Sequence, residues 1–297
     1  MVGPNLISML SSADPQTAFN VGRVLGLQDA RILVVGCGQL GFSIASAARR
    51  LGAQVAVTRT SETKLAETLD ALNAITAEAE PAIGLVLDAN NATSVAEAAD
   101  SLQNRWGTLN GLVHTAGGNN PKEFVPPGNN PFDVDLNEIR STVEDNLMSF
   151  VVALKGFGSL LLASEWSSTI PIGSMAGFTP LPGIAGYNFG KSAIHNATQY
   201  YANMLALHTR SLRHRVNAIA FGYTETPQNR DKLREPDGGL KPRAKAIMSM
   251  HPAGAMGVTD DIAGPAMFLL SPVLSSAVTG VVLAVDRGVQ TSSLPTY

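Results

Sequence analysis

The chain has a single cysteine, Cys37, among its 297 residues, so it contains no intramolecular disulfide. Chains without disulfides are typical of a reducing compartment, and we expect a cytoplasmic protein. Residues 1–20 lack the basic cluster and apolar run that together mark a secretory signal peptide. No continuous apolar run reaches the length of about 20 residues that a membrane-spanning helix needs, so no membrane span is expected.

Charge is also scarce, because charged residues make up only 15% of the sequence and the formal net charge is -3. This balance indicates neither a basic surface for nucleic acid nor a polybasic patch for membranes. The hydrophobic share of 45% is enough for one large core, which predicts a single dinucleotide-binding and catalytic domain over residues 1–297. Within it, residues 1–28 form an N-terminal extension before the first predicted strand.

Short apolar runs alternate along the chain with longer amphipathic segments. The runs are nearly continuous in hydrophobicity, which is typical of parallel strands covered on both faces. The predicted strands are Ile32–Val35, Val55–Thr58, Gly84–Leu87, Gly111–His114, Ile170–Ile172, Val216–Ala220 and Val281–Val285. The predicted helices are Ser43–Leu51, Thr63–Ala74, Ser94–Trp106, Leu136–Leu162 and Tyr187–Thr209. This order predicts an α/β fold, a single-domain Rossmann-type doubly wound parallel sheet with helices on both faces.

Two segments interrupt the alternation, at residues 117–135 and 221–256. Both are rich in glycine and proline, and each follows a predicted strand. Ligands of open α/β sheets bind beyond the carboxyl ends of the strands, and long loops there are usually functional. We therefore expect two substrate-side loops, with ordinary mobile surface loops as the alternative.

Three glycines with the spacing Gly-x-Gly-x-x-Gly follow the first predicted strand and precede a helix: Gly36, Gly38 and Gly41. Glycines at such a turn let a pyrophosphate approach the unpaired N–H groups at the helix N-terminus. The pattern therefore predicts a dinucleotide site that includes the backbone of Leu40.

The end of the second predicted strand indicates which nicotinamide cofactor is bound. A carboxylate there would accept a hydrogen bond from the ribose 2′-hydroxyl and repel a 2′-phosphate. The chain instead has Thr58 and Arg59, and no acid occurs before Glu62. A guanidinium and hydroxyl groups suit a phosphate, so NADP(H) is favoured, with NAD(H) as the alternative. Asp88, which follows the third strand, is predicted either to bind the adenine amino group or to cap a turn.

Tyr187 and Lys191 are four residues apart in a predicted helix and therefore share one face. A tyrosine with the ordinary pKa of about 10 exchanges protons poorly near neutral pH. A nearby ammonium, together with the positive charge of an oxidised nicotinamide, would stabilise the phenolate and lower that pKa. Ser174 ends a predicted strand and could hydrogen-bond the same substrate oxygen. The pattern predicts a carbonyl reductase or alcohol dehydrogenase in which Tyr187 transfers the proton.

With these residues, the chain from about Arg31 to Gly288 resembles the short-chain dehydrogenase/reductase family. Tyr187 and Lys191 match the family's Tyr-x-x-x-Lys signature, and Ser174 lies thirteen residues before the tyrosine, as in the family. Asn146 matches a helix asparagine that anchors a water leading to the lysine. The resemblance also places six residues at the cofactor, of which two belong to the catalytic signature: Ala116, Gly117, Gly222, Thr226, Tyr187 and Lys191.

The resemblance implies a division of roles among four catalytic residues. Tyr187 is the general acid or base, and Ser174 orients and polarises the carbonyl. Lys191 binds the nicotinamide ribose and lowers the pKa of the tyrosine, while Asn146 completes a proton relay. The family resemblance further implies a homo-oligomer, either a homotetramer or a dimer.

The glycine motif departs from the family pattern. Val34, Val35 and Gln39 occupy the family's threonine and first two glycine positions, so only Gly41 is in register. The strand motif that follows also differs, because His114 replaces the first residue of an asparagine pair. We expect His114 to be a core residue at the strand end rather than a second base.

Two features within the family resemble sugar-acid reductases of the mannonate/fructuronate oxidoreductase type. They are the run 116–121 with the insertion that follows it, and the segment 228–252; gluconate 5-dehydrogenase-like members are close alternatives. The substrates are carboxylated polyols, which need a cationic partner. The candidate cations, which could equally be solvated surface charges, are Lys122, Arg230, Lys241 and Arg243.

Other functions stay open. Apolar loop residues such as Phe124 and Leu181 would suit a lipophilic ketone or an acyl thioester. The altered glycine motif is also compatible with a non-catalytic member of the fold that senses NADP(H) or acts as a scaffold. An epimerase or dehydratase fits less well, because such relatives need a larger C-terminal lobe than the segment after Gly222. The expected partner is a small carbonyl or alcohol, with no metal, nucleic acid or membrane.

Overall fold

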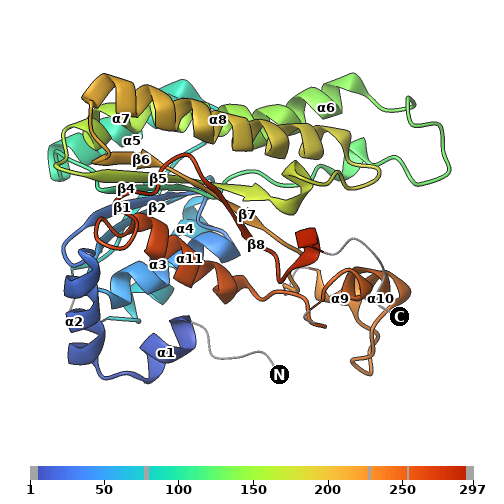
Figure 1. Cartoon of the computed structure of the whole chain (residues 1–297), viewed down its shortest axis with the longest axis horizontal. Helices are drawn as coiled ribbons and strands as arrows, with labels where there is room; N and C mark the ends of the chain where they lie inside the picture. The colour runs from blue at the N-terminus through green and yellow to red at the C-terminus, as the bar shows by residue number, and fades with distance from the viewer. Residues whose placement is uncertain (1–5, 77–79, 227–228, 253, 292–297) are drawn as a thin grey trace.

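The computed structural model describes residues 6–76, 80–226, 229–252 and 254–291. Within them, eight parallel strands form one sheet in the order β3-β2-β1-β4-β5-β7-β8, with β6 paired to β5 (Figure 1). The strands are β1 (Arg31–Val35), β2 (Gln54–Arg59), β3 (Ile83–Val86), β4 (Gly111–His114), β5 (Ser167–Ser174), β6 (His214–Val216), β7 (Ala218–Phe221) and β8 (Val282–Val285).

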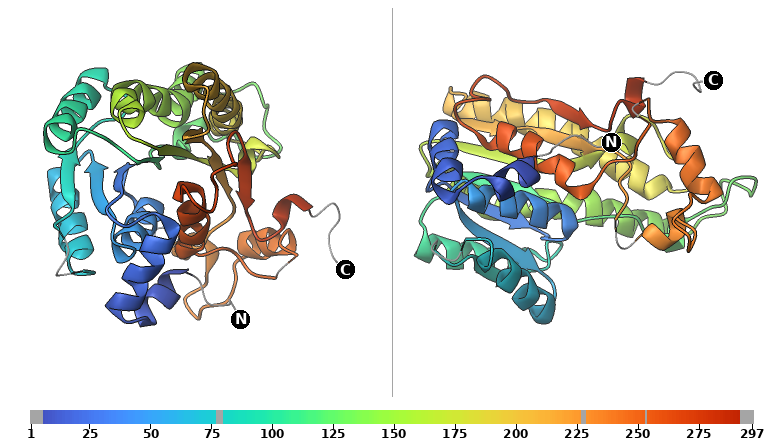
Figure 2. Two further views of the ribbon diagram at one scale, coloured as in Figure 1. Left: turned by 60° about the vertical axis from the view of Figure 1, so that its left-hand side comes forward. Right: turned by 90° about the horizontal axis from the view of Figure 1, so that it is seen from below.

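Helices cover both faces of this sheet, which confirms the predicted fold class (Figures 1 and 2). One layer contains α5 (Ala92–Arg105), α6 (Leu136–Val143), α7 (Ser149–Leu162) and α8 (Ala185–Thr209). The other contains α3 (Gln39–Arg50), α4 (Glu62–Asn73) and α11 (Ala263–Leu270). Two short helices, α1 (Leu6–Ser12) and α2 (Pro15–Leu25), occupy the N-terminal extension and pack against α3.

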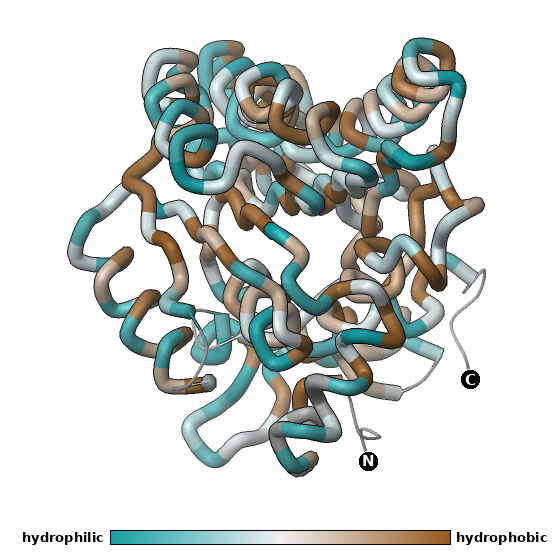
Figure 3. Tube along the Cα trace, turned by 90° about the vertical axis from the view of Figure 1, so that its left-hand side faces the viewer, coloured by the Kyte–Doolittle hydropathy of each residue, from teal (hydrophilic) through white to brown (hydrophobic). Residues whose placement is uncertain are grey.

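The continuous hydrophobicity of the strands follows from this layering. Ile32 and Val34 of β1 belong to the apolar cluster under α3 and α11, whereas Leu33 and Val35 belong to the cluster under α5 and α7. Successive side chains of a strand point to opposite faces, so a strand buried on both faces must be apolar at every position. Apolar residues accordingly follow the central strands in the hydropathy-coloured trace (Figure 3).

Two predicted elements are interrupted in the structure. The predicted strand Val216–Ala220 is divided at Asn217 into β6 and β7. The Asn217 side chain donates to the carbonyl of Val278 (2.9 Å) and accepts from the N–H of Val281 (3.1 Å). The predicted helix Leu136–Leu162 contains a π-helical turn, η2 (Glu144–Met148), between α6 and α7. Both interruptions are local, and the elements on either side of each stay where the hydrophobic pattern predicts them.

Among the described residues, one helical stretch, 136–162, is long and apolar enough to cross a membrane by length and composition alone. Phe150 and Phe157 of this stretch are fully buried in the apolar cluster beneath α5 and α7. Asn146, also buried, contacts the loop after β4. The stretch is therefore a core layer of the Rossmann-type fold.

The two predicted loops contain more regular structure than the sequence indicated. The first includes the short turn η1 (Pro121–Glu123), and the second includes α9 (Arg230–Leu233) and α10 (Pro242–Ser249). A small apolar cluster of Leu233, Ala244, Ile247 and Met256 holds α9 and α10 together. Both segments lie at the end of the sheet where α8 begins, on the right of Figure 1.

Candidate active site

The end of β5 and the first turns of α8 bring three predicted catalytic residues together. Ser174 is the last residue of β5, and its hydroxyl accepts from the N–H of Ala176 (3.1 Å). Ser174 also interacts with the Tyr187 phenol in the direction that lowers the pKa of the tyrosine. The Lys191 Nζ lies 5.7 Å from the centroid of the Tyr187 ring and donates to the carbonyl of Ile172 (2.8 Å). This is the arrangement that the spacing of Tyr187 and Lys191 predicted.

Burial dominates the electrostatics of these groups. It raises the pKa of Tyr187 above its ordinary value, although the hydrogen bond from Ser174 acts in the opposite direction. Burial also lowers the pKa of Lys191 to about 8. Desolvation therefore outweighs the lowering of the tyrosine pKa that was predicted from the lysine. The phenol stays protonated, which is the form that can donate to a carbonyl.

Asn146 lies in the π-helical turn between α6 and α7 and packs against α8. Its amide nitrogen donates to the carbonyls of Gly118 (2.9 Å) and Thr142 (2.8 Å), and its Oδ1 accepts from the N–H of Gly118 (3.1 Å). A Cβ added at Gly117 would lie 2.6 Å from that Oδ1, and one at Gly190 would lie 2.9 Å from the Asn146 Cβ. The side chain thus fixes the loop after β4 against the helix that carries Lys191.

The first glycine of the fingerprint makes a turn that only glycine fits. Gly36 has a φ of 80°, and an added Cβ would lie 2.7 Å from both the N and Cα atoms of Ala116. Its N–H donates to the Thr58 hydroxyl (3.0 Å), and its carbonyl accepts from the Thr115 hydroxyl (2.6 Å). The expectation that Thr58 offers its hydroxyl to a phosphate is therefore wrong, because this buried group holds the turn.

The N-terminus of α3 is open to an anion. Gly38 is the N-cap of α3 and supplies no side-chain hydrogen bond, so the first N–H groups, which include that of Leu40, lack a side-chain partner. A Cβ added at Gly38 would meet nothing closer than 3.9 Å, whereas one at Gly41 would lie 2.9 Å from the Thr115 Oγ1. The residues present therefore fit a pyrophosphate at this turn.

Arg59 lies beside this glycine turn, with Nη1 3.9 Å from the position of a Cβ added at Gly38. Its buried Nε has no hydrogen-bond partner among the residues that the structure describes.

Cys37 is buried nearby, and burial raises the pKa of its thiol to about 12, so the thiol is a neutral filler. Asp88 is exposed and accepts from the N–H of Asn90 (3.0 Å), so it caps a turn, one of the two roles predicted for it.

Gly222 and Thr226 follow β7. A Cβ at Gly222 would lie 2.6 Å from the Asp286 Cα, so glycine is required where the ends of β7 and β8 meet. The N–H of Thr226 donates to the Asn229 Oδ1 (2.7 Å), and its hydroxyl accepts from the Asn229 N–H (3.3 Å). Thr226 therefore belongs to the turn that leads into α9, and its hydroxyl proton stays available for a ligand.

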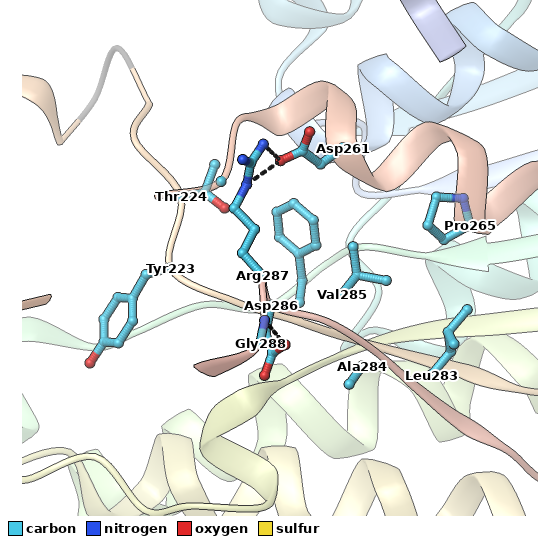
Figure 4. A pocket seen from close by; sticks show the side chains of 12 residues that line it. Tyr223, Thr224, Asp261, Pro265, Leu283, Ala284, Val285, Asp286, Arg287 and Gly288 are labelled. Atoms are coloured by element: carbon cyan, nitrogen blue, oxygen red, sulfur yellow. Dashed lines mark hydrogen bonds and ion pairs between the residues drawn. The ribbon is translucent and has the colours of Figure 1, made fainter. Parts of the chain in front are cut away.

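A cavity of about 430 Å³ lies at the ends of β7 and β8 (Figure 4). An ion pair crosses one wall, where the Arg287 Nε donates to the Asp261 Oδ2 (3.0 Å). Ser174, Tyr187 and Lys191 do not line this cavity. A second cavity of about 390 Å³ lies between the first predicted loop (117–135) and the segment that leads into α8. Its lining is mostly apolar, with Val125, Leu181 and Phe189 among its residues.

The cations proposed for a substrate carboxylate are exposed or hold other groups. The Lys122 side chain is 78% exposed and lies 3.9 Å from Glu138. The Arg230 side chain is 66% exposed and lies 4.0 Å from Glu225. Lys241 donates to the carbonyl of Asp231 (2.7 Å). The side chain of Arg243 lies outside the described part of the chain.

Sequence reasoning missed two residues that organise the site. Thr115 ties β4 to the glycine turn, and its position beside His114 in an altered family motif was the available signal. Glu123 accepts from the N–H groups of Gly186 and Tyr187, and no sequence pattern links it to them. The expectation for His114 is confirmed, because it is buried against Phe150 and burial lowers its pKa to about 3.

Known proteins resemble this chain over much of its length. A family model described as enoyl-(acyl carrier protein) reductase matches residues 38–290. A Haemophilus influenzae protein named as an uncharacterized oxidoreductase is 35% identical over 207 residues, which are 66% of this chain and 70% of that protein.

Two solved structures share the fold over most of the chain. A proposed D-mannonate oxidoreductase from Haemophilus influenza with bound NAD has a TM-score of 0.81 at 27% identity, covering 90% of this chain and 96% of that one. A proposed NAD(P)-dependent gluconate 5-dehydrogenase from Beutenbergia cavernae, with NADP at low occupancy, has a TM-score of 0.76 at 28% identity. The latter alignment covers 89% of this chain and 98% of that one.

Proposed function

The chain is an oxidoreductase of the short-chain dehydrogenase/reductase family, and on that premise we propose that it transfers a hydride between NADP(H) and a carbonyl or secondary alcohol. The observation that carries this proposal is the Tyr187 phenol, which interacts with Ser174, with the Lys191 Nζ 5.7 Å from the tyrosine ring. A non-catalytic sensor would have no need of a half-buried phenol beside both a hydroxyl and a buried ammonium.

The roles of the residues follow from their placement. The bound nicotinamide supplies or accepts the hydride. In reduction, Tyr187 donates the proton of its Oη to the carbonyl oxygen, and in oxidation it takes the proton back from the alcohol. The Ser174 hydroxyl donates to the same oxygen and stabilises its developing charge. Lys191 holds its ammonium beside the phenol and binds the nicotinamide ribose, while Asn146 keeps the loop after β4 against α8.

The preference for NADP(H) is supported by the unpartnered Nε of Arg59 and by the absence of an acid at the end of β2. Replacing Arg59 by alanine is expected to raise the KM for NADPH by about 10- to 100-fold, the value of one or two charge-assisted hydrogen bonds. The KM for NADH should change by less than about threefold, because NADH lacks the 2′-phosphate.

Steady-state kinetics with both cofactors measures this difference. Arg105→Ala, at an exposed arginine at the end of α5, is the matched control and should leave both KM values unchanged. Equal losses for NADPH and NADH in Arg59→Ala would show that the guanidinium does not select the 2′-phosphate.

We further propose a carboxylated polyol as the substrate. The two structural relatives are proposed to act on D-mannonate and gluconate, and the loops around α8 carry cations that face solvent. The alternative is a lipophilic ketone or an acyl thioester, which the apolar cavity of about 390 Å³ favours.

A substrate panel distinguishes these functions. D-Mannonate and D-gluconate are assayed with NADP⁺ and NAD⁺, and 2-decanone and acetoacetyl-CoA are assayed with NADPH and NADH. Oxidation of either sugar acid is expected. Turnover confined to 2-decanone or acetoacetyl-CoA would replace the sugar-acid proposal, and cofactor binding without turnover would favour the sensor.

The homo-oligomer, the cytoplasmic location and the roles of residues 117–135 and 221–256 as substrate-side loops stay predictions. Apolar side chains exposed on α8 are compatible with self-association. They include Tyr200, Met204 and Leu207.

A further inference from the structure

We propose that Glu123 is a positioning residue that sets the place of Tyr187 through the first turn of α8, an inference that rests on the oxidoreductase function proposed above. Glu123 ends the turn η1 in the first substrate-side loop and is only 1% exposed. Its Oε2 accepts from the N–H of Gly186 (2.6 Å), and its Oε1 accepts from the N–H of Tyr187 (3.2 Å). One carboxylate therefore holds the backbone of the proton-transferring residue directly.

The start of α8 needs an acceptor from elsewhere. The first N–H groups of a helix have no partner within it, and the residue before the helix usually supplies one. The N-cap of α8 is Ile184, whose side chain has no acceptor. Glu123 satisfies two of these N–H groups, and its negative charge lies at the positive end of the helix, where a carboxylate is stabilising.

The contact depends on a close approach that glycine permits. A Cβ added at Gly186 would lie 2.6 Å from the Glu123 Oε2 and 2.8 Å from the carbonyl of Ile139. A second tie lies just beyond it, because the N–H of Val125 donates to the carbonyl of Gly183 (3.0 Å). The segment 123–125 is thus fixed against the residues immediately before and within the first turn of α8.

The Glu123 carboxylate interacts with N–H groups of α8 and not with a cation. Within the described ranges, no ion pair includes Glu123, and the adjacent Lys122 pairs instead with Glu138 (3.9 Å). A buried carboxylate that lacks a cation is costly unless its oxygens accept hydrogen bonds, and both oxygens of Glu123 do so. The buried carboxylate is therefore satisfied only if the first turn of α8 presents its N–H groups to it.

The consequence for chemistry is geometric. The Tyr187 phenol must reach both the Ser174 hydroxyl and the substrate oxygen, and a displacement of about 1 Å at a reacting group costs roughly 100-fold in rate. The cofactor turn is built from β1, α3 and β2, which Glu123 does not touch. Loss of the carboxylate should therefore reduce kcat far more than it weakens cofactor binding, because Lys191, which binds the nicotinamide ribose, lies one turn further along α8.

Glu123→Gln tests this, because it keeps the size of the side chain but places an amide NH₂ against one of the two N–H groups. The probe is the member of the substrate panel that the wild type converts fastest. We expect kcat to fall by about 10- to 100-fold, a dissociation constant for NADPH within about twofold, and a larger solvent isotope effect on kcat.

Asp14→Asn is the matched control, since Asp14 caps α2 by accepting from the N–H of Thr17 (3.0 Å). It makes the same acid-to-amide change at a helix that does not carry the site, and its kcat should stay within about twofold of the wild type.

Three results would overturn the proposal: an unchanged kcat in Glu123→Gln, a parallel loss of kcat and NADPH affinity, or a kcat lowered with no change in the isotope effect. If Glu123→Gln does not fold, Glu123→Asp keeps the charge with a shorter reach. An intermediate kcat with unchanged NADPH affinity then supports positioning, whereas wild-type kcat or failure of both variants to fold contradicts it. A wild type that converts no panel member refutes the proposed function instead.

Discussion

Replacing Tyr187 by phenylalanine is expected to lower kcat by a factor of about 100 to 10,000, the contribution typical of a positioned general acid or base. The change removes only the Oη atom, which interacts with Ser174 and would protonate the carbonyl. The ring and the helix are retained, so the affinity for NADPH should stay within about threefold. Steady-state kcat and a fluorescence titration with NADPH measure the two quantities.

Tyr200→Phe is the control for that experiment. Tyr200 lies on the same helix, is 57% exposed and contacts only the ring of Tyr201 among the interactions described (5.2 Å between centroids). Its replacement should leave kcat within about twofold of the wild type, because surface substitutions have small effects. If Tyr187→Phe retained more than about a tenth of wild-type kcat, the proton would have to come from another group.

Lys191 is expected to make the free energy of unfolding depend on pH. Burial lowers the pKa of Lys191 to about 8 from its ordinary value of 10.5. Below pH 8 the ammonium is charged in both the folded and the unfolded chain, so the full cost of burying it is present. As pH rises from 8 towards 10.5, the folded protein releases the proton first, and the unfolded state binds more protons. This one group should therefore raise stability by about 1 kcal/mol between pH 7 and 9, given its pKa of about 8.

Lys191→Met should remove that pH dependence. Denaturant unfolding at pH 7, 8 and 9 gives the difference in unfolding free energy between wild type and variant at each pH. Its change with pH is the quantity to compare, because the variant also leaves the Ile172 carbonyl without its partner. Lys64→Met, at an exposed lysine of α4, should show the same pH dependence as the wild type. Parallel curves for wild type and Lys191→Met would contradict a buried ammonium with a pKa near 8.

The sequence predicted those parts of the site that depend on local geometry. Tyr187 and Lys191 share a helix face because they are one turn apart, and Ser174 ends a strand that the apolar run made visible. Glu123 could not be found in this way, since its contact with the start of α8 depends on where a distant loop folds. The same holds for the hydroxyl of Thr115, which reaches across two strands to Gly36.

Strands and helices were predictable where burial produces a regular spacing of apolar residues in the sequence. They were missed where no such spacing exists. Asn217 is the one polar residue of the predicted strand Val216–Ala220. It divides the strand through side-chain hydrogen bonds to the segment before β8, and the hydrophobic pattern does not reveal these bonds. The π-helical turn at 144–148 adds a local widening to a helix whose apolar pattern continues on both sides. The helices α9 and α10 pack on a small cluster of their own, so their polar sequence resembled a loop.

The last two residues of β2 have different tasks, since one supports the glycine turn and the other is proposed to set the cofactor preference. The Thr58 hydroxyl points inward and holds Gly36, whereas the Arg59 guanidinium lies on the cofactor side of the same turn. On the proposed role of Arg59, substitutions there would alter cofactor preference and leave the glycine turn intact. Substitutions at Thr58 would disturb that turn and so weaken binding of both cofactors alike. If Arg59 selects the 2′-phosphate as proposed, one substitution is enough to change the cofactor, in evolution as in the laboratory.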